Sequence, residues 1–147
     1  MNAPHLRIAL TEVPAELGSR PLLSAVVPCY NEAEGLRECH RRLGAACAAV
    51  AGERYEIVLV DDGSSDATEP IIRELAAVDP HLVGVGLSRN HGHQLALTAG
   101  LAIAQGERIL VIDADLQDPP ELLGKMMAAL DDGADVAYGR ARAGRSG

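Results

Sequence analysis

Residues 55–68 have the sequence YEIVLVDDGSSDAT, in which an apolar segment is followed at once by a cluster of polar residues. The first six residues are almost entirely apolar, which is typical of a strand that is buried on both faces of a parallel sheet. The polar cluster is rich in residues that favour turns and helix N-caps. We therefore predict a strand over 55–60, a tight turn, and a helix over 67–78 that ends before Asp79-Pro80.

The same pattern repeats on both sides of this segment. Before it, an apolar strand over 22–27 is stopped by Pro28, and a helix is predicted over 32–51, before Gly52. Apolar residues recur along one face of that helix at Leu36, Cys39, Leu43, Ala46, Cys47 and Val50. After it, strands are predicted over 82–87, 108–112 and 135–138, and helices over 94–105 and 119–130. Alternation of this kind predicts an α/β fold with a mainly parallel sheet flanked by helices.

The length of the chain favours a single compact domain. Residues 1–20 carry Pro4, Pro14 and Gly18 without sustained periodicity, so we predict a loosely ordered leader with a short extended piece at 6–10. The domain is predicted over 21–147. Its last residues, 140–147, are basic and contain glycine, which is typical of a loop rather than a finished domain end.

Composition narrows the possible classes of protein. Hydrophobic residues make up 48% of the chain, but Phe and Trp are absent, so the core is expected to consist of Ala, Val, Leu and Ile. The net charge of -8 argues against a nucleic-acid partner. It does not exclude a phosphate ligand, because a divalent cation can invert the local field.

The cysteines and the lengths of the apolar runs indicate the expected cellular compartment. Cys29, Cys39 and Cys47 lack the spacing of a metal site and leave an odd thiol, which favours a reducing compartment. No signal peptide opens the chain, and no apolar run approaches the roughly 20 residues of a membrane span. We therefore expect a soluble, cytoplasmic chain.

Polar clusters follow four successive predicted strands, at 28–32, 61–66, 88–93 and 113–118. In parallel sheets, ligands bind at the carboxyl ends of the strands. Because these clusters all fall there, we expect them to converge on one crevice.

The cluster Asp113-Ala114-Asp115 offers two carboxylates separated by one small residue. Oxygen ligands of this kind suit Mg²⁺ or Mn²⁺, which would bridge a diphosphate. The alternative is that Asp115 or Asp118 merely caps the helix that begins near Pro119.

Two other clusters have similar alternatives. Asp62 is predicted to face a ligand, while Asp66 caps the next helix and Gly63 supplies a turn. Tyr30 could present its ring to a nucleobase and Glu32 could bind the polar edge of that base. The alternative for the cluster around these two residues is an N-cap by its asparagine.

The cluster at 88–93 carries Arg89, which could pair with a phosphate or with the carboxylates of Asp113 and Asp115. His91 and His93 are interpreted as hydrogen-bonding residues rather than as a zinc pair. Cys29 lies beside the expected crevice, but no His/Asn arrangement supports a nucleophilic thiol.

Taken together, these motifs resemble the family 2 glycosyltransferases, inverting enzymes of the GT-A fold. The matching stretches are VVPCYNEAEGL at 26–36, YEIVLVDDGSSDAT at 55–68, LSRNHGHQLALTAGLAIAQGE at 87–107 and VIDADLQDPPELL at 111–123. The last two point to the branch that transfers sugars to polyprenyl phosphates, such as dolichyl or undecaprenyl phosphate. The resemblance implies the Rossmann-like, nucleotide-binding half of the GT-A fold, incomplete at its C-terminus.

The resemblance also implies roles for individual residues. The base and ribose of a nucleotide-sugar donor would contact Pro28, Tyr30, Glu32, Val60 and Asp62, and the nucleotide would also contact Asp113 and Ala114. Asp115 and Gln117 would hold Mg²⁺ or Mn²⁺. A phosphate-binding arginine follows the fifth strand in this branch, and Arg140 and Arg142 flank the corresponding position, which is alanine here.

The implied reaction is a metal-assisted inverting displacement that passes the sugar to a polyprenyl phosphate at the cytoplasmic face of a membrane. A homo-oligomer or a membrane-anchoring partner is compatible with it. One alternative is a donor-binding module that binds nucleotide-sugar and metal without efficient transfer. Another, a nucleotidyltransferase, is disfavoured because PCYNEAEGLR at 28–37 lacks a Gly-rich, basic phosphate loop.

Overall fold

The computed structural model describes residues 6–8, 20–135 and 137. They form a five-stranded sheet with the strand order β1-β4-β3-β2-β5. Its parallel strands are β2 (Leu23–Cys29), β3 (Tyr55–Asp61), β4 (Leu82–Leu87) and β5 (Arg108–Val111). The short strand β1 (Leu6–Ile8) pairs antiparallel with β4 at one edge. The prediction of a mainly parallel sheet is confirmed.

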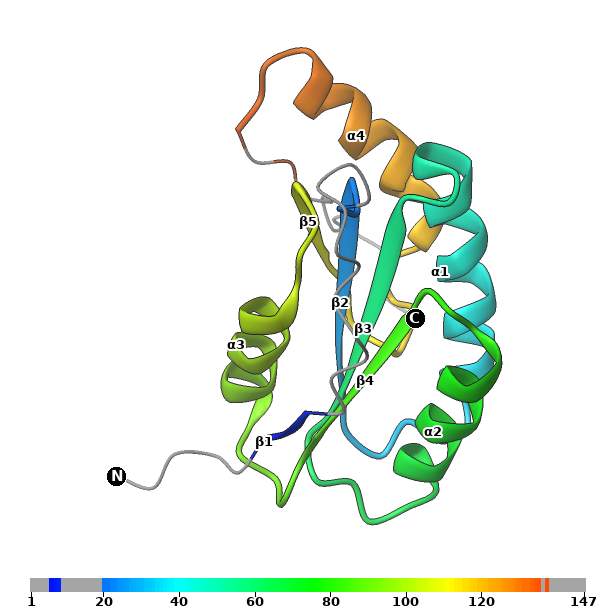
Figure 1. The fold of residues 1–147 in the computed structure, drawn as a ribbon, viewed down its shortest axis with the longest axis vertical. Helices are drawn as coiled ribbons and strands as arrows, with labels where there is room; N and C mark the ends of the chain where they lie inside the picture. Colours follow the sequence, from blue (N-terminus) through cyan, green and yellow to red (C-terminus); the bar gives the residue numbers. More distant parts are fainter. Residues whose placement is uncertain (1–5, 9–19, 136, 138–147) are drawn as a thin grey trace, which may run out of the picture.

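Helices cover both faces of this sheet (Figure 1). One face carries α1 (Leu36–Ala51), α2 (Thr68–Val78), the 3₁₀ turn η2 (Pro120–Leu122) and α4 (Leu123–Asp131). The other face carries α3 (His93–Ile103), which packs mainly against β2 and β3. The parallel strands therefore lie between two helical layers, which explains their nearly continuous apolar sequences.

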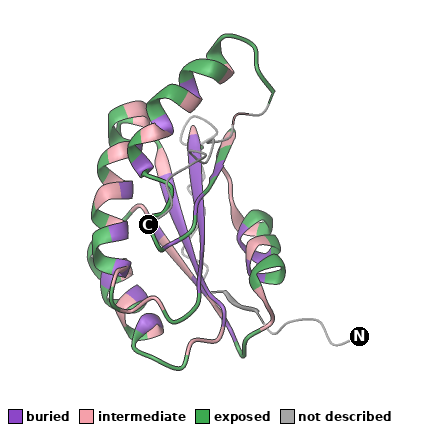
Figure 2. Ribbon diagram, turned by 180° about the vertical axis from the view of Figure 1, so that it is seen from behind, coloured by how far each residue is buried: buried purple, intermediate pink, exposed green. Residues whose placement is uncertain are grey.

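The core lies on both faces of the sheet, as Figure 2 shows in purple. Successive residues of a strand point to opposite faces, so Ile57 and Leu59 of β3 pack with α1 and α2, while Val58 and Val60 pack with α3. The predicted apolar face of α1 is confirmed, because Leu36, Cys39, Leu43 and Cys47 are fully buried, and Ala46 and Val50 pack against the same cluster.

The boundaries differ from the predictions at several points. The first helix begins at Leu36 rather than at residue 32, since the chain makes turns between the end of β2 and this residue. The extended piece expected at 6–10 is β1, which covers Leu6–Ile8. The strand predicted over 135–138 falls mostly outside the described residues, and Asp135 itself lies in a bend. The division into a leader and a domain stays a prediction.

A buried polar cluster lies at the amino ends of the parallel strands, opposite to the strand ends that carry the polar residues of the cavity. The Glu56 carboxylate accepts hydrogen bonds from the Ser24 hydroxyl (2.5 Å) and from the backbone N–H of Gln105 (2.6 Å). The Ser24 hydroxyl oxygen accepts in turn from the N–H of Gly106 (2.7 Å). These contacts fix the connection from α3 to β5, and with it the start of β5 beside β2.

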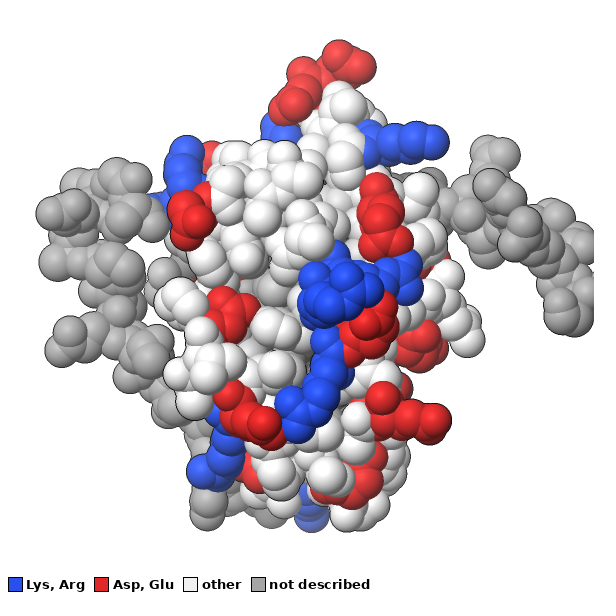
Figure 3. Space-filling model, turned by 90° about the vertical axis from the view of Figure 1, so that its right-hand side faces the viewer, with Lys and Arg blue, Asp and Glu red and all other residues white. Residues whose placement is uncertain are grey.

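The outer surface of α1 is charged but not uniformly basic. Its arginines pair with acidic residues, as in Arg37–Glu74 (2.7 Å), Arg41–Glu38 (2.5 Å) and Arg42–Glu121. Figure 3 shows blue and red side chains interspersed on this side of the molecule. Exposed pairs of this kind contribute little to stability, and they leave no free basic patch on α1.

Asp79 links α1 to the turn between α2 and β4. Its carboxylate oxygens lie 2.6 Å from His40 Nε2 and 2.9 Å from the backbone nitrogen of His81, both of which donate. Its side chain is only 16% exposed. Burial alone would raise the pKa of Asp79, but the hydrogen bonds from His40 and His81 outweigh it and lower the pKa.

This lowered pKa predicts how stability depends on pH. A carboxyl group whose pKa is lower in the folded state stabilises the fold above its unfolded pKa of about 3.9, and this contribution is lost as the pH falls through the folded pKa. We expect Asp79→Asn to lower the free energy of unfolding by about 1–3 kcal/mol at pH 7. The difference from the unchanged chain should shrink below about pH 4.

Urea unfolding measured between pH 7 and pH 3 checks this expectation. Asp132→Asn is the matched control, because Asp132 is exposed at the end of α4. A difference between Asp79→Asn and the unchanged chain that stays constant over this range would contradict the prediction.

Candidate functional site

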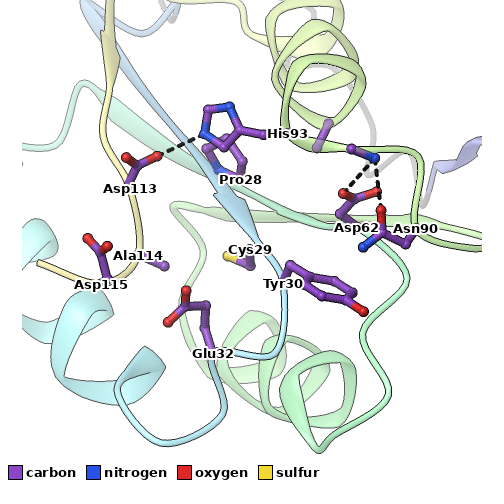
Figure 4. A pocket seen from close by; sticks show the side chains of 12 residues that line it. Pro28, Cys29, Tyr30, Glu32, Asp62, Asn90, His93, Asp113, Ala114 and Asp115 are labelled. Carbon is purple, nitrogen blue, oxygen red and sulfur yellow. Dashed lines mark hydrogen bonds and ion pairs between the residues drawn. The ribbon is translucent and has the colours of Figure 1, made fainter.

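The strand order places a crevice beside the carboxyl end of β2. From β2 the chain moves outward to β3 and then β4, and it returns to β5 on the other side of β2. At such a switch point the loops that leave neighbouring strands diverge, and ligands of open α/β sheets bind there. A cavity of about 310 Å³ lies at this place, between the loops that follow β2, β3, β4 and β5 (Figure 4).

The wall of this cavity brings together many of the residues predicted from the sequence. They are Pro28, Tyr30, Glu32, Asp62, Asp113, Ala114 and Asp115. The remaining wall residues are Cys29, Asn90, Gly92, His93 and Ala96. The volume is within the range of small-molecule sites.

Other predicted site residues lie elsewhere. Val60 is fully buried beneath α3, because its side chain points to the face of the sheet that α3 covers. Arg89 is exposed and does not line the cavity, and Gln117 also lies outside its wall. Arg140 and Arg142 are outside the described residues. The roles assigned to these residues stay predictions.

The loop after β3 holds the loop after β2 in place. The Asn31 side-chain oxygen accepts from the backbone N–H groups of Ser65 (2.9 Å) and Asp66 (3.3 Å), and the N–H of Glu32 donates to the Thr68 hydroxyl (2.9 Å). Asn31 has a φ of 52°, a conformation that asparagine tolerates better than most residues. Asn31 therefore does not cap α1; it fixes the loop that carries Tyr30 and Glu32.

The same β3 loop holds the start of α3. The two oxygens of Asp62 accept from the backbone N–H groups of His91 (2.7 Å) and Gly92 (3.0 Å). Gly63, with a φ of +66°, lies against the backbone of Arg89 and Asn90. Asp62 is thus at the cavity, as predicted, and its carboxylate also organises the opposite loop.

The segment after β5 turns sharply at the cavity. Ala114 is buried, whereas Asp113 and Asp115 are exposed on either side of it. Leu116 has a φ of 61°, a left-handed conformation that is strained for leucine, and Asp115 Oδ1 accepts from the N–H of Gln117 (3.1 Å). No side chain caps η2 within the described residues, so the alternative of a purely capping role for Asp115 or Asp118 is not supported.

The cavity is strongly acidic. Four carboxylates line it, and no lysine or arginine of the described residues does. Burial, followed by the nearby charges of Asp115, Asp66 and Asp113, raises the pKa of Glu32. The charge of these carboxylates disfavours an anionic ligand unless a cation accompanies it.

The donor atoms fit a hard divalent cation. Within the described part of the chain, no three His, Cys, Asp or Glu side chains are placed to hold a metal ion by themselves. Mg²⁺ is often held by only one or two carboxylates, with water and substrate phosphates completing its shell. The oxygen atoms of Asp113 and Asp115 suit such a partial site.

Cys29 lies in the cavity wall but is not suited to nucleophilic catalysis. Its side chain is buried, and burial, together with nearby Cys39 and Asp61, raises the pKa of the thiol well above its usual value. A neutral thiol is a poor nucleophile. All three cysteines are free and buried.

The cluster at 88–93 was expected at this crevice, and its residues Asn90, Gly92 and His93 line the cavity, although none of the three was given a role in ligand binding. His93 Nε2 lies 2.9 Å from Asp113 Oδ1 across the cavity, and Asn90 accepts from the N–H of Gly92 (3.0 Å). The signal was present, since this polar stretch follows a strand and opens a helix. What the sequence did not show was which of its polar side chains point into the cavity.

Comparisons with known proteins agree with this arrangement. Residues 24–147 match the family model described as glycosyl transferase family 2. The chain is 46% identical over 115 residues to an uncharacterized glycosyltransferase, YkcC, of Bacillus subtilis. It is 45% identical over 115 residues to the undecaprenyl-phosphate 4-deoxy-4-formamido-L-arabinose transferase of Klebsiella pneumoniae. Each match covers 78% of this chain and 35% of the relative, so the match spans about a third of these relatives.

A solved structure is similar as well. The mannosyltransferase PcManGT from Pyrobaculum calidifontis, in complex with GDP-Man and Mn²⁺, aligns with a TM-score of 0.67 and 28% identity. The alignment covers 86% of this chain and 36% of that protein. In the described part of this chain, none of the helices is both long and apolar enough to cross a membrane.

Proposed function

The chain belongs to glycosyl transferase family 2, and from this premise we propose that it transfers a sugar from a nucleotide-diphosphate donor to a polyprenyl phosphate. The family is one of glycosyltransferases, and the sheet of this chain is the Rossmann-like half of a GT-A fold. The relatives include undecaprenyl-phosphate sugar transferases, which supports the choice of acceptor.

The observation that carries this proposal is the acidic cavity at the switch point of the sheet. A nucleotide-sugar carries a negatively charged diphosphate, which four carboxylates would repel unless a cation lay between them. We propose that Asp115 and Gln117 hold Mg²⁺ or Mn²⁺. The PcManGT complex contains GDP-Man and Mn²⁺, which supports the choice of a nucleotide-sugar and a divalent cation for this cavity.

The nucleoside would lie on the side of the cavity away from Asp115. Tyr30 presents a ring that is 46% exposed, and Figure 4 shows it near Asp62 and Asn90. We assign Tyr30, with Pro28 and Glu32, to the base and ribose, and Asp113 with Ala114 to the nucleotide. Asp62 holds the loop before α3 in place and lines one wall of the cavity.

The proposed reaction is a single inverting displacement. An oxygen of the polyprenyl phosphate forms a bond to the anomeric carbon while the bond from that carbon to the nucleoside diphosphate breaks. A phosphate is already ionised near neutral pH, so the acceptor needs no general base from the chain. A bound divalent cation would neutralise the charge of the departing diphosphate. A lipid acceptor requires a membrane surface, and we propose that the reaction takes place at the cytoplasmic face.

A donor-binding unit without transfer of its own is the second candidate. The observation behind it is that the cavity residues assigned above all serve the donor or its cation. The cavity wall described above serves donor binding in either case.

Two assays on the chain distinguish these candidates. Calorimetry with UDP or GDP and Mn²⁺ measures donor binding, and radiolabelled nucleotide-sugar with polyprenyl phosphate in vesicles measures transfer. We expect binding that requires Mn²⁺, together with transfer. Binding without transfer would favour the donor-binding unit, and binding of neither nucleotide would exclude both.

A further inference from the structure

A histidine contacts the first carboxylate of the Asp113–Asp115 segment. His93, the first residue of α3, points its Nε2 at Asp113 Oδ1 at a distance of 2.9 Å (Figure 4). The two residues are 20 positions apart, one at the start of α3 and the other in the segment that follows β5. A carboxylate only accepts, so the imidazole must donate from Nε2.

The position of His93 is itself fixed by the β3 loop. Asp62 binds the N–H groups of the two residues before His93, and Gly92 adopts a φ of +96° just before the helix. Figure 4 draws one of these contacts, the dashed line from Asp62 to the backbone at the start of α3. A continuous series of contacts therefore runs from Asp62 through the backbone of His91 and Gly92 to His93 and Asp113.

We propose that His93 is a positioning residue that orients the carboxylate of Asp113 toward the nucleotide–metal complex, and that Asp62 acts on Asp113 through it. The inference rests on the proposed function and adds to it a residue that the sequence did not assign. With Oδ1 held by the imidazole, Oδ2 of Asp113 is left to face the donor.

Stability alone does not explain this contact. The side chains of His93 and Asp113 are 59% and 56% exposed, and exposed pairs contribute little to folding. The contact limits the rotamers of Asp113, whose side chain is exposed just after the end of β5. A carboxylate that is already oriented loses less freedom when a ligand binds.

A double-mutant cycle tests whether His93 acts through Asp113. The variants are His93→Ala, Asp113→Asn and the double variant, and the measurement is calorimetric affinity for UDP or GDP with Mn²⁺. We expect His93→Ala to weaken binding by about tenfold and to have almost no further effect in the Asp113→Asn background. His93→Gln, which retains a side-chain N–H donor, should restore part of the affinity.

Gln94→Ala is the matched control, because Gln94 is the next residue of α3, is exposed and does not line the cavity. It should bind nucleotide as the unchanged chain does, and all variants should keep the unfolding temperature. An equal loss from His93→Ala with and without Asp113 would overturn the proposal, since the histidine would then act independently.

Nitrogen-15 NMR of the histidine rings tests the contact without nucleotide. We expect Asp113→Asn to shift the ring resonances of His93 and to leave those of His40 unchanged. A His93 ring that does not respond would overturn the contact. If the unchanged chain bound neither nucleotide, the proposed function would fail, and the ring resonances would still decide whether His93 and Asp113 are partners.

Discussion

An Asp115→Asn variant is expected to bind UDP or GDP in the presence of Mn²⁺ at least about 100-fold more weakly than the unchanged chain, because loss of even an outer contact to a metal ligand costs about 10–100-fold. Asp115 stands at the cavity beside the strained turn at Leu116, and its Oδ1 is tied to the N–H of Gln117. Asparagine keeps the size and one acceptor oxygen but removes the charge. In a cavity lined by four carboxylates and by no lysine or arginine of the described residues, that charge is what would draw in a cation.

Calorimetry with and without Mn²⁺ measures this loss, and addition of EDTA to the unchanged chain should reproduce it. Asp118→Asn is the matched control, because Asp118 lies three positions further on and outside the cavity wall. Equal nucleotide affinity for Asp115→Asn and the unchanged chain would show that Asp115 is not a metal ligand.

The second large effect is expected from Gly63→Ala, which should destabilise the fold by about 3 kcal/mol or more. A Cβ at this position would lie 2.1 Å from the carbonyl carbon of Arg89 and 2.3 Å from the nitrogen of Asn90. These are backbone atoms that no side-chain rotation can move away. A left-handed backbone costs a residue with a side chain roughly 1–2 kcal/mol, and forced displacement of packed atoms costs about 1–3 kcal/mol.

The same substitution should weaken nucleotide binding, since it pushes away the loop whose N–H groups contact Asp62. Urea unfolding and calorimetry measure the two effects. Gly35→Ala is the control, because a Cβ there meets nothing within 4 Å and Gly35 has a φ of −104°. A Gly63→Ala chain as stable as the Gly35→Ala chain would contradict the close approach.

Much of the site could be predicted because it depends on where each strand ends. The apolar run at Tyr55–Val60 and the polar residues after it are local features, and so are the corresponding features around Pro28 and Asp113. Parallel strands bring their carboxyl ends to the same edge of a sheet. That rule was sufficient to place Tyr30, Glu32, Asp62, Asp113 and Asp115 around one cavity.

Some residues with predicted roles lie outside the cavity wall, and some wall residues had no predicted role, for an equally physical reason. Val60 and Asp62 are two positions apart, yet one lies in the core and the other at the cavity, because β3 ends between them. Arg89 and His93 belong to one polar stretch, and only the turn at Gly92 decides that His93 faces Asp113. Side-chain direction in a loop depends on the backbone and side-chain torsion angles, which the residue types alone do not specify.

The sequence by itself determined the alternation of strands and helices, the apolar face of α1 and the clustering of carboxylates at the strand ends, because hydrophobic periodicity and turn residues act locally. Only the tertiary structure decided the order of the strands, the role of Asp62 as the acceptor for His91 and Gly92, and the contact between His93 and Asp113. These contacts join residues 20 to 30 positions apart. They depend on how β3, β4 and β5 lie relative to one another, which no local pattern contains.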